Sequence, residues 1–334
     1  MKQMIGIRIS VLCAPAYLTI VAICFAKPQE LSEAVLANDE VKVRQLIADG
    51  ADVNASNILK QTPVFFVENV RILYVLHENG ANIECVACRR TPLEYAAENG
   101  RIEIVAALRK LGARYTFKAA ILQNDSDFLE SEIRSNPEIV NERLGCGDLP
   151  LSLSAKSRTN ESCRILLKHG ANPSGTTEGR PVILSALDHP EVLKLLIDKG
   201  SNLRRRIPMR NEFILGGEPS ILHFALLVGN LESIKICVHA GLDVNAVDTS
   251  GLSILGLAIM LSGKETPPLL VRKDRPNTEI IRFLLENDAS LRLLAKDRTD
   301  SVALAIEWEC PEEIIELLME KTKSTYQNTT DPPR

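Results

Sequence analysis

The sequence predicts an all-α repeat solenoid in which short pairs of helices stack in a row. The first observation is a phrase that follows helical runs of apolar residues, as in Gly50-Ala51-Asp52 and Gly80-Ala81-Asn82. Glycine ends a helix in the left-handed conformation without a Cβ clash, and the Asp or Asn after it starts a turn. The second observation is Pro in a first helical turn, as in Thr62-Pro63 and Thr91-Pro92. Pro loses no hydrogen bond there, and the preceding Thr can cap the helix.

Both phrases recur along the chain. Further copies are Gly112-Ala113, Gly170-Ala171-Asn172, Gly200-Ser201-Asn202, Gly241-Leu242-Asp243 and Asn287-Asp288-Ala289 for the first, and Leu149-Pro150 and Ser220-Ile221-Leu222-His223 for the second. Together they resemble the ankyrin repeat, whose pattern joins Thr-Pro-Leu-His-x-Ala to a later Gly-Ala phrase. The resemblance covers most of residues 28–319. It implies helix-turn-helix units joined by β-hairpin-like loops and stacked into one elongated curved domain.

The resemblance implies about eight or nine units over residues 27–320, in place of the two domains that the length suggests. We place them approximately at 28–57, 58–87, 88–116, 117–145, 146–175, 176–205, 216–248, 249–292 and 296–320. The second and sixth units are short and need tight inter-helix loops, and the fourth lacks the closing glycine phrase. Insertions lie at residues 204–217 and 262–277, and the polar residues 321–334 predict a disordered tail. In the first unit Asn38 replaces the inter-helix Gly, and Asn tolerates the left-handed conformation.

Residues 1–26 have the pattern of a secretory signal peptide. Lys2 and Arg8 precede an uncharged apolar stretch, residues 9–26, that ends with the small residues Cys24 and Ala26 at positions −3 and −1. The sequence therefore predicts an exported protein, periplasmic or secreted. Two alternatives stay open, namely an uncleaved signal anchor that holds the protein in a membrane and a wrongly assigned start.

Composition disfavours a nucleic-acid-binding protein. Aromatic residues make up 4% of the chain, and the formal net charge is −4. Removal of residues 1–26 reduces the 39 Lys and Arg to 37 against 43 Asp and Glu, a net charge of −6. A mildly acidic chain with few aromatic residues is a poor general binder of phosphate backbones.

The sequence contains no catalytic motif that we can identify. It has no His-Glu-x-x-His, no phosphate-binding loop and no Gly-x-Ser-x-Gly. The resemblance implies a loop hydrogen bond for His223 rather than catalysis. We therefore expect neither an enzyme nor a bound cofactor or metal.

Cys85-Val86-Ala87-Cys88 has the spacing of half a zinc site or of a redox pair. Ordinary loop cysteines, a local disulfide, and metal or redox chemistry are the alternatives for this pair. Four other cysteines outside the signal peptide have mostly apolar neighbours and are expected in the core; they are Cys146, Cys163, Cys237 and Cys310.

The family's binding face, transferred position by position, predicts partner contacts at hairpin tips and at the ends of the first helices. The tip residues are Ile58, Leu59, Gln61, Cys88, Arg89, Arg90, Thr249, Ser250 and Leu252, and the helix-end residues are Glu98, Asn99, Leu227 and Val228. The apolar pairs Ile58-Leu59 and Leu227-Val228 are the strongest candidates, because clustered exposed apolar residues are informative. The alternative is that drift of the repeats buried them.

The densest basic run is Arg204-Arg205-Arg206, with Arg210 close by, in the inserted connection. It is either a solvated loop or a contact for an anion or an acidic partner, since guanidinium groups match carboxylate and phosphate geometry.

These observations predict a non-catalytic, exported protein-binding module that displays a rigid concave face to an unidentified protein. Three alternatives remain: a membrane-tethered scaffold, a minor redox or metal activity at Cys85 and Cys88, and a toxin or effector delivered into another cell. The sequence indicates neither the partner nor the oligomeric state.

Overall fold

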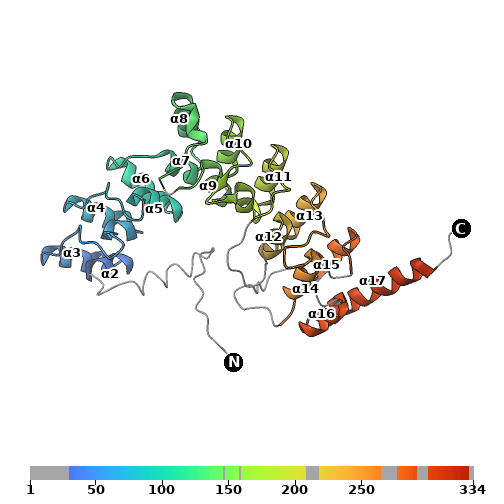
Figure 1. Cartoon of the computed structure of the whole chain (residues 1–334). Coiled ribbons are helices and arrows are strands. Elements are labelled where there is room, and N and C mark those ends of the chain that lie inside the picture. Colours follow the sequence, from blue (N-terminus) through green and yellow to red (C-terminus); the bar gives the residue numbers. More distant parts are fainter. Residues whose placement is uncertain are drawn as a thin grey trace. The chain divides into compact units, whose positions relative to one another are not determined.

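The computed structural model describes residues 30–145, 147–157, 159–207, 218–264, 277–291 and 300–330, with side chains as far as residue 324 (Figure 1). The expected signal peptide, Cys146 and Arg210 lie outside the described residues, as does most of both insertions. Within the described ranges no helix combines the length and apolar character that a bilayer crossing requires. The chain divides into two compact units, unit 1 up to Ala119 and unit 2 from Ala120.

Unit 1 is built from successive pairs of short helices. They are α2 (Glu30–Leu36) and α3 (Glu40–Ala48), the 3₁₀ helix η1 (Pro63–Phe66) and α4 (Val70–Glu78), α5 (Pro92–Glu98) and α6 (Ile102–Lys110), and the start of α7 (Phe117–Gln123). The first helices α2, η1 and α5 pack in sequence, and the second helices α3, α4 and α6 form a parallel row. The unit therefore has two helical layers.

Unit 2 repeats this arrangement. It contains α8 (Ser126–Ser135), η2 (Pro137–Val140), α9 (Pro150–Lys156), α10 (Asn160–Lys168), η3 (Val182–Ala186), α11 (Pro190–Asp198), α12 (Ile221–Val228), α13 (Leu231–His239), α14 (Ile254–Met260), α15 (Asn277–Glu286), α16 (Ser301–Glu307) and α17 (Glu312–Thr330). The first helices α9, η3, α12, α14 and α16 pack in sequence, and so do the second helices α8, α10, α11, α13, α15 and α17. The predicted all-α repeat solenoid is confirmed.

The connections between repeats are hairpin-like, as predicted. The strands β1 (Thr176–Thr177) and β2 (Arg180–Pro181) pair antiparallel, and single bridges join Ala87 to Arg90 and Val247 to Ser253. The two short repeats also have the expected tight loops, but their first helix is a 3₁₀ turn, η1 or η3, rather than an α-helix. A 3₁₀ turn uses fewer residues per turn, so it fits where the repeat is shortened.

The helix ends follow the glycine phrase. The glycines at positions 50, 80, 112, 170, 200 and 241 have φ from +86° to +93°. Asn38 takes the left-handed conformation in the first repeat with φ of +56°, as expected for a residue that replaces Gly there.

We call the turn that follows the second helix of a repeat its closing turn. In several repeats a side chain of the closing turn forms hydrogen bonds with the closing turn of the following repeat. In unit 1 the Asn54 side chain donates to the Gly80 carbonyl at 2.9 Å and accepts from the Asn82 amide at 2.7 Å. Unit 2 contains the same arrangement at Asn141 with Gly170 and Asn172, at Ser174 with Gly200 and Asn202, and at Asn245 with Asp288 and Ser290. This inter-repeat clamp sets the register between neighbouring repeats.

His223 is buried and joins the start of α12 to the next hairpin. Its Nδ1 lies 2.8 Å from the Ser220 hydroxyl and accepts from the Ser220 amide, and its Nε2 lies 3.2 Å from the Leu252 carbonyl. Because that carbonyl can only accept, Nε2 bears the proton and donates. The loop hydrogen bond implied by the sequence is therefore confirmed.

The segment predicted to be a disordered tail differs in the structure, where α17 continues to Thr330. Buried Ile314 and Leu318 pack the first half of this helix against its neighbours. Once a helix is nucleated, each added residue gains a hydrogen bond at little further cost. Thr322 also donates its hydroxyl to the Leu318 carbonyl at 2.7 Å. Residues 331–334 lie outside the described residues.

His223 predicts a pH dependence of stability. Burial lowers the pKa of His223 below the ordinary 6.5. Just below pH 6.5 the unfolded chain therefore binds a proton at this residue more readily than the folded chain does. The unfolding free energy should fall as the pH drops below that value, by at most about 1.4 kcal/mol per pH unit. We expect wild type to lose about 1 kcal/mol more than His223→Gln between about pH 7.5 and 5.5 in urea unfolding. Equal losses in the two proteins would contradict this role.

Candidate partner-binding site

The hairpin before η1 presents apolar side chains to solvent. The Asn57 side-chain oxygen accepts from the amides of Leu59 at 2.9 Å and Gln61 at 3.0 Å, which closes a tight turn. Lys60 stands in the left-handed region with φ of +60°. The turn leaves Ile58 62% and Leu59 36% exposed. Gln61, by contrast, is buried, and its side-chain oxygen accepts from the side-chain amide of Asn57 at 3.1 Å. The structure therefore contradicts the expectation that the Gln61 side chain faces a partner.

The hairpin before α5 lies beside the first one. The Cys88 thiol lies 3.7 Å from the Leu59 carbonyl, and the Cys85 sulfur lies 3.4 Å from the Thr62 hydroxyl. Cys88 and Arg89 occupy its tip with φ of +50° and +63°. Left-handed non-glycine residues cost about 1 kcal/mol each, and they persist where the surrounding structure imposes them.

Val86, on this second hairpin, is 62% exposed. We call Ile58, Leu59 and Val86 the tip cluster. The sequence pattern does not single out Val86, because the residue lies inside the Cys85-x-x-Cys88 spacing that is typical of thiol chemistry. Its position in the hairpin, among residues already expected at a tip, was the available signal. Lys60 and Arg89, both exposed, flank the cluster.

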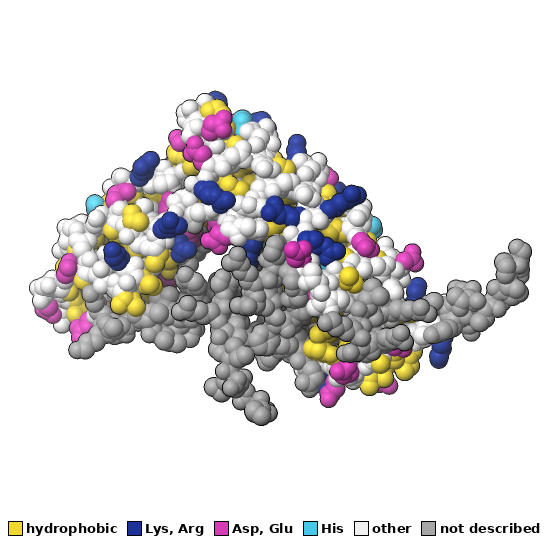
Figure 2. Space-filling model, in the orientation of Figure 1, with side chains coloured by type: hydrophobic (Ala, Val, Ile, Leu, Met, Phe, Trp, Pro, Cys, Tyr) yellow, Lys and Arg dark blue, Asp and Glu magenta, His cyan; other side chains and the backbone are white. Residues whose placement is uncertain are grey.

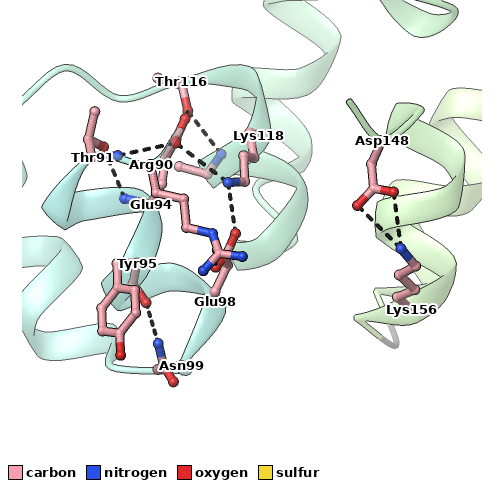
Figure 3. A network of polar contacts seen from close by, with 11 residues as sticks. Arg90, Thr91, Glu94, Tyr95, Glu98, Asn99, Thr116, Lys118, Asp148 and Lys156 are labelled. Carbon is pink, nitrogen blue, oxygen red and sulfur yellow. Dashed lines mark hydrogen bonds and ion pairs between the residues drawn. The ribbon is translucent and has the colours of Figure 1, made fainter. Parts of the chain in front are cut away.

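A network of polar contacts fixes the second hairpin to α5 (Figure 3). Thr91 and Glu94 form a capping box, with the Glu94 amide donating to the Thr91 hydroxyl at 3.2 Å. In return, one Glu94 carboxylate oxygen accepts from the Thr91 amide at 3.4 Å. The other carboxylate oxygen accepts from the Thr116 hydroxyl at 2.8 Å. The carboxylate therefore both caps α5 and holds the segment that leads into α7.

Lys118 lies at the centre of this network. Its ammonium is 2.7 Å from the Glu98 carboxylate and 3.5 Å from Glu94, and the side chain is 4% exposed (Figure 3). Arg90 pairs with the other Glu98 oxygen at 3.0 Å. Two cations thus balance two carboxylates in a water-poor setting, where an unpaired charge is costly.

Some predicted contact residues already have partners within the repeat. Arg90 and Glu98 pair with each other, and the Asn99 side-chain amide donates to the Tyr95 carbonyl at the end of α5 at 2.7 Å (Figure 3). Arg89 is the hairpin arginine that remains exposed. Arg90 and Glu98 thus position the hairpin beneath the tip residues.

In unit 2 the second apolar pair is only partly exposed. Leu227 and Val228 are half-buried at the end of α12, and Leu252 is half-buried with its backbone bonded to Asp248 and His223. These residues are therefore less exposed than the tip of the first hairpin, and their contact with a partner stays a prediction. Thr249 and Ser250 are exposed, as are Arg204 and Arg205.

The cysteines give no support to a redox or metal centre. Cys85 and Cys88 are free thiols, and burial raises the Cys85 pKa, which disfavours a reactive thiolate. Among the described residues no group of three or more His, Cys, Asp and Glu could hold a metal ion. Cys163, Cys237 and Cys310 lie in the core as predicted, where burial raises their pKa values to about 11, 12 and 11.

Replacing Lys118 should destabilise unit 1. Lys118→Met leaves two largely buried carboxylates short of a cation, and we expect a loss of about 3 kcal/mol in unfolding free energy. Urea unfolding followed by circular dichroism measures it. The matched control is Lys110→Met on the exposed face of α6, expected to change stability by less than about 0.5 kcal/mol. Combining Lys118→Met with Glu98→Gln should cost less than the two single changes together, and strict additivity would contradict the network.

Comparison with known proteins agrees with this structure. Residues 31–119 match the family model for ankyrin repeats, in three copies. The ankyrin repeat protein nuc-2 of Neurospora crassa is 25% identical over 245 residues, which cover 69% of this chain and 22% of that protein. The human transient receptor potential cation channel subfamily A member 1 is 24% identical over 170 residues, or 47% of this chain and 15% of the channel. This chain thus spans less than a quarter of either relative's length.

Among solved structures, the ankyrin repeat domain of human ASB11 is similar, with 18% identity and a TM-score of 0.40 over 79% of this chain and 99% of that one. The family match to residues 31–119 and the two layers of stacked helices in each unit lead to one conclusion. The chain contains ankyrin repeats and has the ankyrin repeat fold.

Proposed function

We propose that this chain is a non-catalytic protein-binding module whose partner docks on the tip cluster of unit 1. The observation behind the proposal is that Ile58, Leu59 and Val86 stay exposed on two adjacent hairpins whose backbones are held by internal hydrogen bonds. Burying apolar surface contributes about 25 cal/mol per Å². A site that is already ordered loses little conformational entropy on binding.

The charges around the tip cluster favour a partner segment that combines apolar and acidic side chains. Lys60 and Arg89 are exposed on the two hairpins. The carboxylate of Glu84, on the second hairpin, accepts from the Arg114 amide at 2.7 Å and is thereby tied to the next repeat. Carboxylates placed beside the partner's apolar residues would meet both cations.

The test uses two variants of the full chain that are matched in composition. Ile58→Ser with Val86→Ser removes the two most exposed side chains of the tip cluster. Val41→Ser with Ile102→Ser removes one Val and one Ile that are 79% and 68% exposed on the second helices α3 and α6. We expect a partner captured by wild type to bind the tip variant at least about tenfold more weakly and the control variant normally. Circular dichroism checks that each variant is folded. Equal loss in both variants, or no loss in the tip variant, would refute the proposed face.

We further propose that the protein is exported after cleavage behind Ala26. The support is the pattern of Lys2, Arg8 and the uncharged residues 9–26. We expect the intact mass of the protein from its native cell to begin at Lys27, in the periplasm or the medium. Recovery in the membrane with Met1 to Ala26 retained would support the tethered scaffold instead. A soluble cytosolic protein with that segment would exclude both.

A further inference from the structure

Unit 2 exposes five arginines on successive hairpins, which we call the arginine row. They are Arg143, Arg180, Arg204, Arg205 and Arg206. Arg143 lies in the hairpin before α9, Arg180 begins β2, and the last three lie in the connection that follows α11. Figure 2 shows several Lys and Arg side chains near one another over the region that Figure 1 labels α9 to α13.

Two members of the row tie neighbouring hairpins together. Arg143 donates to the Gly147 carbonyl of its own hairpin at 2.8 Å and to the Thr176 carbonyl of the next at 2.9 Å. Arg206 donates to the Glu218 carbonyl at 3.2 Å and to the Val247 carbonyl at 2.6 Å. These guanidinium groups are therefore held at the hairpin edge of unit 2.

The arginine row keeps its positive charge. None of the five forms an ion pair with a carboxylate among the residues that the structure describes, and the acceptors of Arg143 and Arg206 are neutral carbonyls. Two other cations of this unit are paired with carboxylates. Lys156 lies 3.0 Å from Asp148 (Figure 3), and Lys168 lies 2.8 Å from Glu130.

The hairpins and the second helices of unit 2 differ in charge. The described hairpins that bear the row contain five Arg and three Glu, a net charge of +2. The Glu are Glu142, Glu178 and Glu218. This count leaves out Asp148, because its charge is balanced by Lys156. The second helices α8, α10, α11 and α13 together contain five Lys and Arg against seven Asp and Glu, a net of −2. An acidic ligand is thus attracted to the hairpin edge rather than to the second helices.

We propose that the arginine row binds an acidic segment of a protein, laid across the successive hairpins. Guanidinium forks match carboxylates in geometry and bind them in bidentate pairs. A protein segment can place spaced carboxylates at the arginines and neutral residues at the interspersed glutamates, whereas a continuous phosphate backbone would also face the glutamates. The described hairpin residues also include no aromatic side chain on which bases could stack. The arginine row and the tip cluster share no residue, so either proposal can fail alone.

The probe is a fluorescein-labelled peptide of about 12 residues, alternating Glu and Ala, followed by fluorescence anisotropy with the full chain at about 50 and 200 mM salt. Arg180→Ala with Arg204→Ala and Arg205→Ala removes three charges and keeps Arg143 and Arg206, which hold the hairpins. The matched control removes three exposed charges from the second-helix side: Arg164→Ala, Lys194→Ala and Lys199→Ala.

We expect the triple variant to bind the peptide at least about fivefold more weakly at the lower salt, the control variant to bind within about twofold of wild type, and the difference to shrink at the higher salt. Should the triple variant not fold, Arg204→Gln with Arg205→Gln replaces it. The proposal is overturned by absence of binding at the lower salt or by equal losses in both variants. Tighter binding of a 12-nucleotide single strand that displaces the peptide would overturn it in favour of nucleic acid.

Discussion

The contact on which the rest of this structure depends is the inter-repeat clamp, in which a side chain of one closing turn holds the turn of the next repeat. Asn54 is its clearest example, since one amide group both donates to Gly80 and accepts from Asn82. A single repeat buries too little apolar surface to fold alone, so stability comes from the interfaces between neighbours. The clamp sets the register in which those interfaces form, and Asn141, Ser174 and Asn245 repeat it in unit 2.

The clamp also explains how the fold can display different chemistry along its edge. When the closing turns are held, the hairpins project in order, and their outermost residues are free to vary without loss of packing. In unit 1 those positions contain Ile58, Leu59 and Val86, and in unit 2 they contain exposed arginines. Two surfaces of different character can therefore be built on the same repeat, which is how repeat proteins acquire specificity.

The polar network around Lys118 positions the second hairpin of unit 1 more than it stabilises the fold. Burying two carboxylates and two cations incurs a desolvation cost that their mutual attraction only partly offsets. The network nevertheless ties Arg90, at the base of the second hairpin, to Glu98 at the end of α5, and Lys118 reaches both Glu94 and Glu98. The hairpin below Val86 is thus braced over the full length of the helix, which suits a rigid display of the tip cluster.

The sequence by itself determined the repeat fold and the helix ends that a glycine or a proline marks. Those features depend on local backbone geometry, in which a glycine such as Gly80 or a proline such as Pro92 restricts the chain whatever its surroundings. Only the tertiary structure decided which candidate residues face solvent: Ile58 and Val86 are exposed, whereas Gln61 and Leu227 are wholly or partly covered. The reason is that exposure depends on side chains of the neighbouring repeat and on the shortened first helices η1 and η3, and no local pattern encodes either of them.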